Sequence, residues 1–251
     1  MQTQLENLTA LSILDVPSSS IHIQIHSSKL EHNISGHSFS FNFDRAQGQL
    51  TEWISQGQVV FTKDPVTGSA LTPSFWRAPT DNDMTSELPY WKRFGLDAMT
   101  SQLRSLEISS EQGCVRLNIH TYLSAPILAW GFNAKMIYTI TASGGLTIKI
   151  HLTPVGSMPK NLPRIGLNVR LHESFDNASW LGLGPGEAYP DKRSSQKHGW
   201  YTATTEELYT PYEVPQENGN RMETRWVEML NRQGKGVRAR MSTNGQQVRF
   251  N

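Results

Sequence analysis

Short runs of alternating apolar and polar residues, separated by turn residues, restrict the folds open to this sequence. The clearest run is residues 39–43 (FSFNF), which is followed by a turn-like segment at 44–48 (DRAQG). An alternation with a period of two places the three phenylalanines on one face of a strand. A Ser-Gly-Gly segment at 143–145 separates two further runs, as the turn of a β-hairpin does. The pattern predicts an all-β chain.

Nine further segments show features of strands, and one segment favours a helix. The strand-like segments lie at 21–25, 50–54, 59–61, 115–122, 134–141, 146–152, 165–171, 225–230 and 237–241. The helix-like segment, at 88–99, is short. Many short strands with almost no helix predict a β-sandwich.

Length and charge exclude several classes of protein. A chain of 251 residues suits one large all-β domain or two small ones. The net charge is +1 and there is no basic tract, so we expect no nucleic-acid or membrane-surface partner. Cys114 is the only cysteine, which excludes an intrachain disulfide and a thiolate metal cluster.

The two ends of the sequence differ from its middle. Residues 1–17 are polar and irregular, and we interpret them as a linker or the end of a preceding module. They lack the pattern of a signal peptide, and no stretch reaches the roughly 20 apolar residues of a membrane span, so we expect a cytoplasmic protein. Residues 245–251 resemble a strand that has just begun. A domain rarely ends at such a point, because an unpaired strand edge invites association with other chains. We therefore expect residues 18–251 to be one domain that is truncated at its C-terminus.

Three motifs identify a family. They are residues 71–83 (LTPSFWRAPTDND), 180–193 (WLGLGPGEAYPDKR) and 209–221 (YTPYEVPQENGNR), with 163–167 (PRIGL) as a weaker fourth. Their order and spacing resemble the C-terminal domain of the lacZ-type family 2 β-galactosidases, also called the β-galactosidase small chain. The similarity runs from about residue 20 to the end of the sequence.

The resemblance implies a fold and a partner. The fold is the large twisted β-sandwich, or supersandwich, that this family shares with the galactose mutarotases. The partner is a (β/α)8 barrel, as a neighbouring domain or a separate large subunit, beside which the domain completes one wall of a galactoside pocket. The complete enzyme hydrolyses terminal β-D-galactosides such as lactose, and we expect it to be an oligomer.

The resemblance also implies which groups this chain does not supply. Retaining glycoside hydrolysis needs two carboxylates about 5 Å apart, and in this family both are glutamates of the barrel. The Mg²⁺ and Na⁺ of the pocket also belong largely to the barrel. A tryptophan that stacks on the sugar comes from strands beyond the last motif, and no residue here matches it. We therefore expect no catalytic residue, cofactor or metal in this chain, and no hydrolysis by the chain alone.

The first motif is predicted to form a polar, hydrogen-bonded bend. Asp, Asn and Thr side chains cap their own backbone, and Pro79 fixes one dihedral angle. Arg77 is suited by charge to pair with Asp81 or Asp83. In the family the loop that follows this motif moves over the active site, and its counterpart here is 84–89. The motif is therefore either a structural bend or part of a gate.

The second motif is glycine-rich without being a phosphate-binding loop, because it lacks the Lys-Ser/Thr pair and Pro185 has no amide donor. We interpret its glycines as allowing a tight turn in which Glu187, Asp191 and Arg193 pair. The competing interpretation is direct sugar contact, in which Glu187 binds hydroxyls and Tyr189 covers an apolar sugar face.

The third motif combines aromatic rings with amide and carboxylate groups, a mixture found in sugar sites and in ordinary loops. The candidate pocket residues are Asp81, Asn82, Asp83, Glu87, Glu187, Tyr189, Tyr212, Glu217 and Asn218. The candidate structural residues are Trp76, Arg77, Pro79, Gly182, Gly184, Pro185, Asp191 and Arg193.

Three other functions stay open from the sequence. The chain could be a stand-alone carbohydrate-binding module, because a fold does not fix a function. It could be an aldose 1-epimerase, which needs a histidine and a glutamate that face each other; the histidines in or beside strand-like runs are His120, His151 and His172. It could also be an inactive fragment.

Overall fold

The computed structural model describes residues 23–111, 113–240 and 249–250, which form two compact units. The first contains the described residues up to His172, and the second those from Glu173 onward. The predicted linker at 1–17, two residues of the strand predicted at 21–25 and most of the segment at 245–251 lie outside the described residues. Phe250, within that last segment, pairs with Arg221 in an isolated antiparallel bridge.

The first unit contains a five-stranded antiparallel sheet in the order β1-β2-β3-β4-β5. Its strands are β1 (Gln24–Ser27), β2 (Glu31–Ser35), β3 (Phe39–Asp44), β4 (Gln49–Ser55) and β5 (Gln58–Phe61). The predicted alternation in β3 is confirmed, because its phenylalanines are buried and the residues between them are half-exposed. The predicted turn at 44–48 joins β3 to β4.

A second antiparallel sheet of longer strands has the order β10-β9-β8-β7. Its strands are β7 (Thr100–Glu111), β8 (Cys114–Ser124), β9 (Gly131–Thr141) and β10 (Leu146–Val155). The Ser-Gly-Gly segment forms the predicted hairpin between β9 and β10. A separate antiparallel pair joins β6 (Leu71–Ser74) to β11 (Gly166–Val169).

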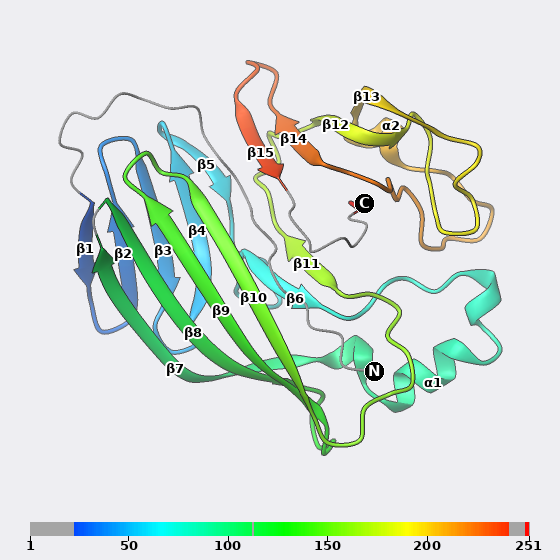
Figure 1. Cartoon of the computed structure of the whole chain (residues 1–251), viewed down its shortest axis with the longest axis horizontal. Coiled ribbons are helices and arrows are strands. Elements are labelled where there is room, and N and C mark those ends of the chain that lie inside the picture. Colours follow the sequence, from blue (N-terminus) through cyan, green and yellow to red (C-terminus); the bar gives the residue numbers. More distant parts are fainter. Residues whose placement is uncertain (1–22, 112, 241–248, 251) are drawn as a thin grey trace. The chain divides into compact units, whose positions relative to one another are not determined.

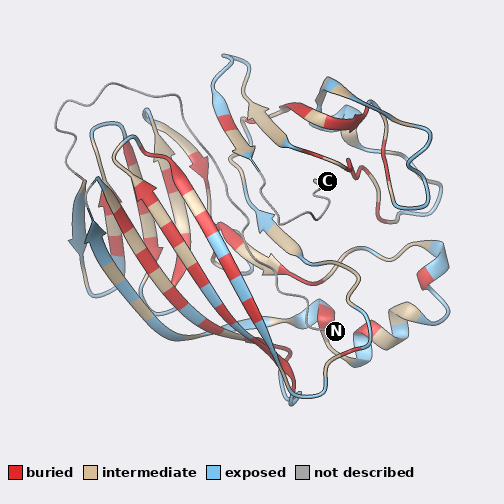
Figure 2. Ribbon diagram, in the orientation of Figure 1, coloured by how far each residue is buried: buried red, intermediate tan, exposed pale blue. Residues whose placement is uncertain are grey.

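The two large sheets face each other as a sandwich, and their inner faces form the core of the first unit (Figures 1 and 2). Phe43 of β3 meets Tyr138 of β9 edge to face, with ring centroids 5.2 Å apart. Buried residues alternate with exposed ones along β8, β9 and β10, as the red bands in Figure 2 show. Each fully buried large apolar side chain contributes roughly 1.5–3 kcal/mol of transfer free energy. The all-β sandwich prediction is confirmed.

The predicted helix at 88–99 is two shorter pieces. The helix α1 (Glu87–Arg93) is followed by the 3₁₀ turn η2 (Leu96–Ala98), and a first 3₁₀ turn, η1 (Asp81–Asp83), precedes both. Gly95 separates α1 from η2 with a φ of +65°, which a glycine adopts without steric cost. None of the helices in the described ranges is long and apolar enough to cross a membrane.

The second unit is built on a four-stranded antiparallel sheet in the order β13-β12-β14-β15. Its strands are β12 (Asn177–Gly184), β13 (Lys197–Thr204), β14 (Trp226–Leu230) and β15 (Gly236–Arg240). The short helix α2 (Thr205–Leu208) begins at a capping box formed by Thr204 and Glu207. Trp180 of β12 has an exposed fraction of 0% and contacts Tyr201 and Phe250 on the buried face of this sheet.

Candidate functional site

The first motif, residues 71–83, centres on the carboxylate of Asp83. Arg77 donates two hydrogen bonds to it, of 2.7 and 3.1 Å, one to each oxygen. The amide and the hydroxyl of Thr80 donate two more, of 2.7 and 2.8 Å. The prediction that Arg77 pairs with Asp81 or Asp83 is confirmed, and the partner is Asp83.

An aromatic ring covers the Arg77 side of this ion pair, whose two side chains are 20% and 10% exposed. The Arg77 guanidinium lies 5.0 Å from the centre of the Trp91 ring, and Trp76 meets Trp91 edge to face at 6.2 Å. Burial opposes ionisation of Asp83, but the hydrogen bonds from Arg77 and Thr80 outweigh it and hold the pKa of the carboxyl below its usual range. The motif is therefore a rigid, ionised bend.

The other candidate residues near this bend differ in their surroundings. Asp81 and Asn82 are exposed on η1. Glu87 begins α1, and its carboxylate accepts a 2.7 Å hydrogen bond from the side-chain amide of Asn161. The segment 84–89 thus runs from η1 into the first turn of α1, and its Met84 is exposed.

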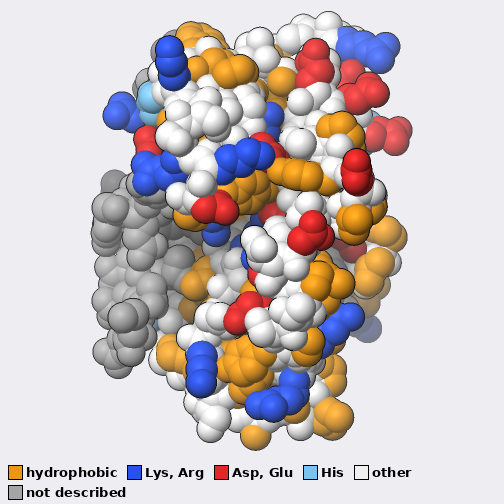
Figure 3. Space-filling view, turned by 90° about the vertical axis from the view of Figure 1, so that its right-hand side faces the viewer, with side chains coloured by type: hydrophobic (Ala, Val, Ile, Leu, Met, Phe, Trp, Pro, Cys, Tyr) orange, Lys and Arg blue, Asp and Glu red, His pale blue; other side chains and the backbone are white. Residues whose placement is uncertain are grey.

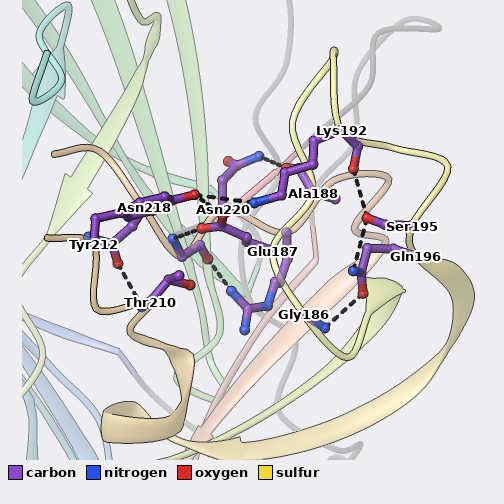
Figure 4. Close-up of polar contacts among 12 residues, drawn as sticks. Gly186, Glu187, Ala188, Lys192, Ser195, Gln196, Thr210, Tyr212, Asn218 and Asn220 are labelled. Atoms are coloured by element: carbon purple, nitrogen blue, oxygen red, sulfur yellow. Dashed lines mark hydrogen bonds and ion pairs between the residues drawn. The ribbon is translucent and has the colours of Figure 1, made fainter. Parts of the chain in front are cut away.

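In the second unit, the loops after β12 and before β14 meet around Glu187, whose exposed fraction is 5% (Figure 4). Its Oε1 atom accepts hydrogen bonds from the Lys192 ammonium, at 2.5 Å, and from the Tyr212 hydroxyl. Its Oε2 atom accepts a 3.1 Å hydrogen bond from the Gly219 amide. One buried carboxylate therefore connects the second and third sequence motifs.

These contacts shift the pKa values of all three ionisable partners. Burial disfavours the charged form of Glu187, but hydrogen bonds from Lys192, Tyr212 and the Gly219 amide outweigh it and lower the pKa to about 2. The hydrogen bond to Glu187 raises the pKa of Lys192 and that of Tyr212. At neutral pH the cluster holds a carboxylate, an ammonium and a neutral phenol.

The lowered pKa of Glu187 predicts a loss of stability in acid. In the folded state the pKa of Glu187 is about 2, below the ordinary value of 4.5. At pH values above 4.5 the ionised carboxylate therefore stabilises the folded state by about 3 kcal/mol. That stability falls as the pH drops from about 4.5 through about 2. Urea unfolding at several pH values measures the slope. The Glu187→Gln variant should lose this part of the dependence, and a variant with the wild-type slope would contradict the assignment.

Backbone and amide contacts extend the same loop assembly. The Ala188 amide donates to the Asn220 carbonyl at 2.7 Å, and the Asn220 side chain donates back to the Ala188 carbonyl at 2.5 Å. Arg221 is buried, donates to the Gly219 carbonyl at 2.6 Å and lies 5.4 Å from the centre of the Trp180 ring. The loops are thus fixed to each other and to the sheet beneath.

The remaining candidate residues of the second unit belong to this assembly. The side chain of Asn218 accepts from the Thr210 amide at 3.2 Å and donates to the Gln216 carbonyl at 2.9 Å, which closes the third motif into a compact loop. Tyr189 is half-buried, and burial together with the charges of Glu217 and Glu187 raises its pKa. Glu217 is buried. Five candidates therefore come together here.

Two details of the second motif differ from the prediction. Gly182 and Gly184 are not turn residues but the last part of strand β12. A Cβ atom on Gly184 would lie 2.6 Å from Cδ2 of Tyr201, so glycine allows this cross-strand ring to approach. The turn follows at Pro185, after the cis peptide bond between Gly184 and Pro185.

The predicted pairing of Glu187, Asp191 and Arg193 is wrong. Lys192 is the cation that binds Glu187, and Arg193 forms its ion pair with Glu223 instead. Asp191 is exposed. Glu223 lies 30 residues from Arg193 on the other loop, and the order of charges in one motif does not specify that contact. Lys192 lies five residues from Glu187 in the same motif, which offers two neighbouring cations and does not show which of them faces the carboxylate.

Two of the histidines considered for an epimerase, His120 and His151, have no glutamate as register partner in the described sheet. His120 of β8 and His151 of β10 are exposed, and Lys135 of β9 is the direct register partner of both. His172 is half-buried at the end of the first unit. Within the described ranges, no group of three or more His, Cys, Asp or Glu side chains is placed to hold a metal ion.

One face of the molecule carries side chains of both charges (Figure 3). On the face shown in Figure 3, basic, acidic and hydrophobic side chains are interspersed. This distribution gives a polyanion no continuous basic path to follow.

The fold and the loop assembly define an all-β sandwich domain with a preformed arrangement of aromatic, amide and carboxylate groups. The model of the beta galactosidase small chain family matches residues 35–250. The chain belongs to this β-galactosidase small-chain family.

Curated relatives agree with this assignment. The chain is 31% identical to a β-galactosidase of Kluyveromyces lactis over 192 residues, 32% to one of Vibrio cholerae over 202 residues and 34% to one of Enterobacter cloacae over 195 residues. These alignments cover 74–75% of this chain. The chain spans 18–19% of the length of these relatives.

Proposed function

We propose that this chain forms a non-catalytic wall of a β-galactosidase, beside a barrel that carries the two catalytic glutamates. The observation that carries the proposal is the family match over residues 35–250, which includes all three loop motifs. In the proposed enzyme the substrate is a terminal β-D-galactoside such as lactose. The partner is the barrel, as a domain or as a large subunit, and the complete enzyme is a cytoplasmic oligomer.

The ionisation of Glu187 and Asp83 argues against a general-acid role for either carboxyl. A general acid of a glycosidase needs a raised pKa so that it holds a proton near neutral pH. Glu187 has a pKa of about 2, and the pKa of Asp83 is also lowered, so both are ionised. Their oxygens already accept three and four hydrogen bonds respectively. A carboxylate engaged in this way holds loops in place.

In this proposal the metal ions of such an enzyme lie outside this chain. The described residues offer no group of three or more acidic, histidine or cysteine side chains for Mg²⁺. In the proposal these ions are therefore held by the barrel, and no step of the reaction is assigned to a metal bound by this chain.

A binding experiment tests the proposed partner. The chain is mixed with a β-galactosidase from which the small-chain domain has been removed, and sedimentation velocity measures the complex. We expect a complex with one chain per barrel. A Tyr212→Phe variant should bind more weakly, because it lacks the hydroxyl that connects the third motif to Glu187. Two species that sediment independently at micromolar concentrations would contradict the proposal.

A further inference from the structure

Two tryptophans lie on the face of the second unit's sheet that is opposite to the buried Trp180. Trp200 of β13 and Trp226 of β14 are both register partners of Leu181 on the central strand β12. Trp180, the preceding residue of β12, points to the opposite face and is fully buried. The alternation of a strand therefore places Trp200, Leu181 and Trp226 in one row on the face opposite to Trp180.

The two indole rings lean toward each other across this row. Strands two positions apart in a sheet are separated by about 10 Å, yet the ring centroids of Trp200 and Trp226 are only 5.4 Å apart. Their planes meet at 87°, so the rings form a corner. Trp200 keeps an exposed fraction of 67%, which leaves most of its surface open to solvent.

Hydrogen-bonding groups border this corner. In the next row, Glu228 of β14 is paired with Arg238 of β15, and their charged groups approach to 3.2 Å. The Arg238 guanidinium lies 4.8 Å from the centre of the Trp226 ring. Thr202 and Ser179 continue the same row across β13 and β12. Trp226 is thus covered by a cation, while Trp200 is the open ring.

We propose that this corner is a second carbohydrate site that binds a hexopyranoside. One face of a pyranose ring is lined by C–H groups and stacks on an exposed indole, whereas its hydroxyls need bidentate polar partners at the edge. Trp200 supplies the open ring, and Glu228 and Arg238 supply a carboxylate and a guanidinium on the side of the neighbouring Trp226. The inference goes beyond the proposed function, since this site needs no barrel.

The surroundings favour a sugar over a docked protein. A stable protein interface buries on the order of 800 Å² on each partner around an apolar centre. The row of Trp200, Leu181 and Trp226 adjoins, on one side, a row that contains two hydroxyl residues and an ion pair. Such an apolar row beside polar groups matches the size of one or two sugar rings.

Indole N–H signals in NMR spectra of the isolated, isotope-labelled chain test the site. We expect lactose to shift the signals of Trp200 and Trp226 with a dissociation constant on the order of 1–10 mM. The signals of the buried Trp53 and Trp180 should stay in place. Sorbitol, which has hydroxyls but no ring, should shift none of them.

Variants separate this site from other sources of a shift. Trp200→Ala should weaken lactose binding by about tenfold or more, Trp200→Phe should weaken it less, and Leu30→Ala, at an exposed apolar residue of the first unit, should leave it unchanged. Unshifted signals at saturating lactose, equal shifts with sorbitol, or unaltered binding by Trp200→Ala would overturn the inference. Each of these results leaves the proposed barrel partner untouched.

Discussion

Replacing Glu187 by alanine is expected to lower the free energy of unfolding of the second unit by about 3 kcal/mol. The substitution leaves the buried Gly219 amide without its acceptor and removes the group that holds Lys192 and Tyr212 together. The Lys192 side chain is half-exposed, so its ammonium is solvated by water once the carboxylate is removed. The expected loss of stability is therefore at the lower end of the range for a broken buried ion pair. Glu187→Gln retains the shape and one acceptor, and should lose about half as much.

Urea unfolding followed by tryptophan fluorescence measures this effect, and hydrogen exchange locates it. A loss of about 3 kcal/mol moves the urea midpoint down by roughly 1–2 M. The amides of β12 and β13 should exchange faster, while those of β8 and β9 in the first unit stay protected. The control is Glu213→Ala, an exposed glutamate of the neighbouring loop before β14, which should change stability by less than about 0.5 kcal/mol. Equal effects of both substitutions would show that Glu187 is not the anchor.

The second large effect is expected at Asp83. Its replacement by alanine leaves Arg77 with a partly buried charge against the Trp91 ring, and deprives Thr80 of the acceptor for its amide. We expect a loss of about 2–4 kcal/mol from the first unit. Arg77→Lys should also destabilise, because an ammonium cannot reproduce the two-oxygen contact of the guanidinium.

A double-mutant cycle with Arg77→Ala and Asp83→Ala isolates the pair. We expect a coupling energy of about 1–3 kcal/mol, measured from urea unfolding of the four proteins. Asn82→Ala, at an exposed neighbour on the same 3₁₀ turn, is the matched control and should be near neutral. Additive effects of the two substitutions would contradict a direct interaction.

The strands that could be predicted from the sequence are those with one buried face. In β3, β8 and β9 the alternation of burial follows the alternation of residue types, so the pattern was sufficient. The longest strand, β7, was missed because it is an edge strand whose residues are mostly exposed and polar. The strand β6 was not predicted because it contains Pro73, and proline argues against a strand. The end of β12 was predicted as a turn because of its glycines.

The candidate site was predictable where its contacts are local. The Arg77–Asp83 pair spans six residues within one motif, so charge and spacing were enough to suggest it. The contacts of Glu187 with Tyr212 and Gly219 span 25 and 32 residues, and depend on how two loops fold against each other. Glu223, which lies 30 residues from Arg193, was missed for the same reason. Lys192 lies only five residues from Glu187 and was missed because the neighbouring Arg193 was assigned as the cation. Motif order identified the family, and only the three-dimensional structure identified the partners.

The hydrolysis rate of a chromogenic β-galactoside tests the central claim most directly. Three samples are compared: this chain, a β-galactosidase without its small-chain domain, and the mixture. We expect no release of galactose by the chain alone, and a rate in the mixture that rises until one chain is present per barrel. Turnover by the chain alone at enzyme-like rates, or a mixture no faster than the barrel by itself, would contradict the account.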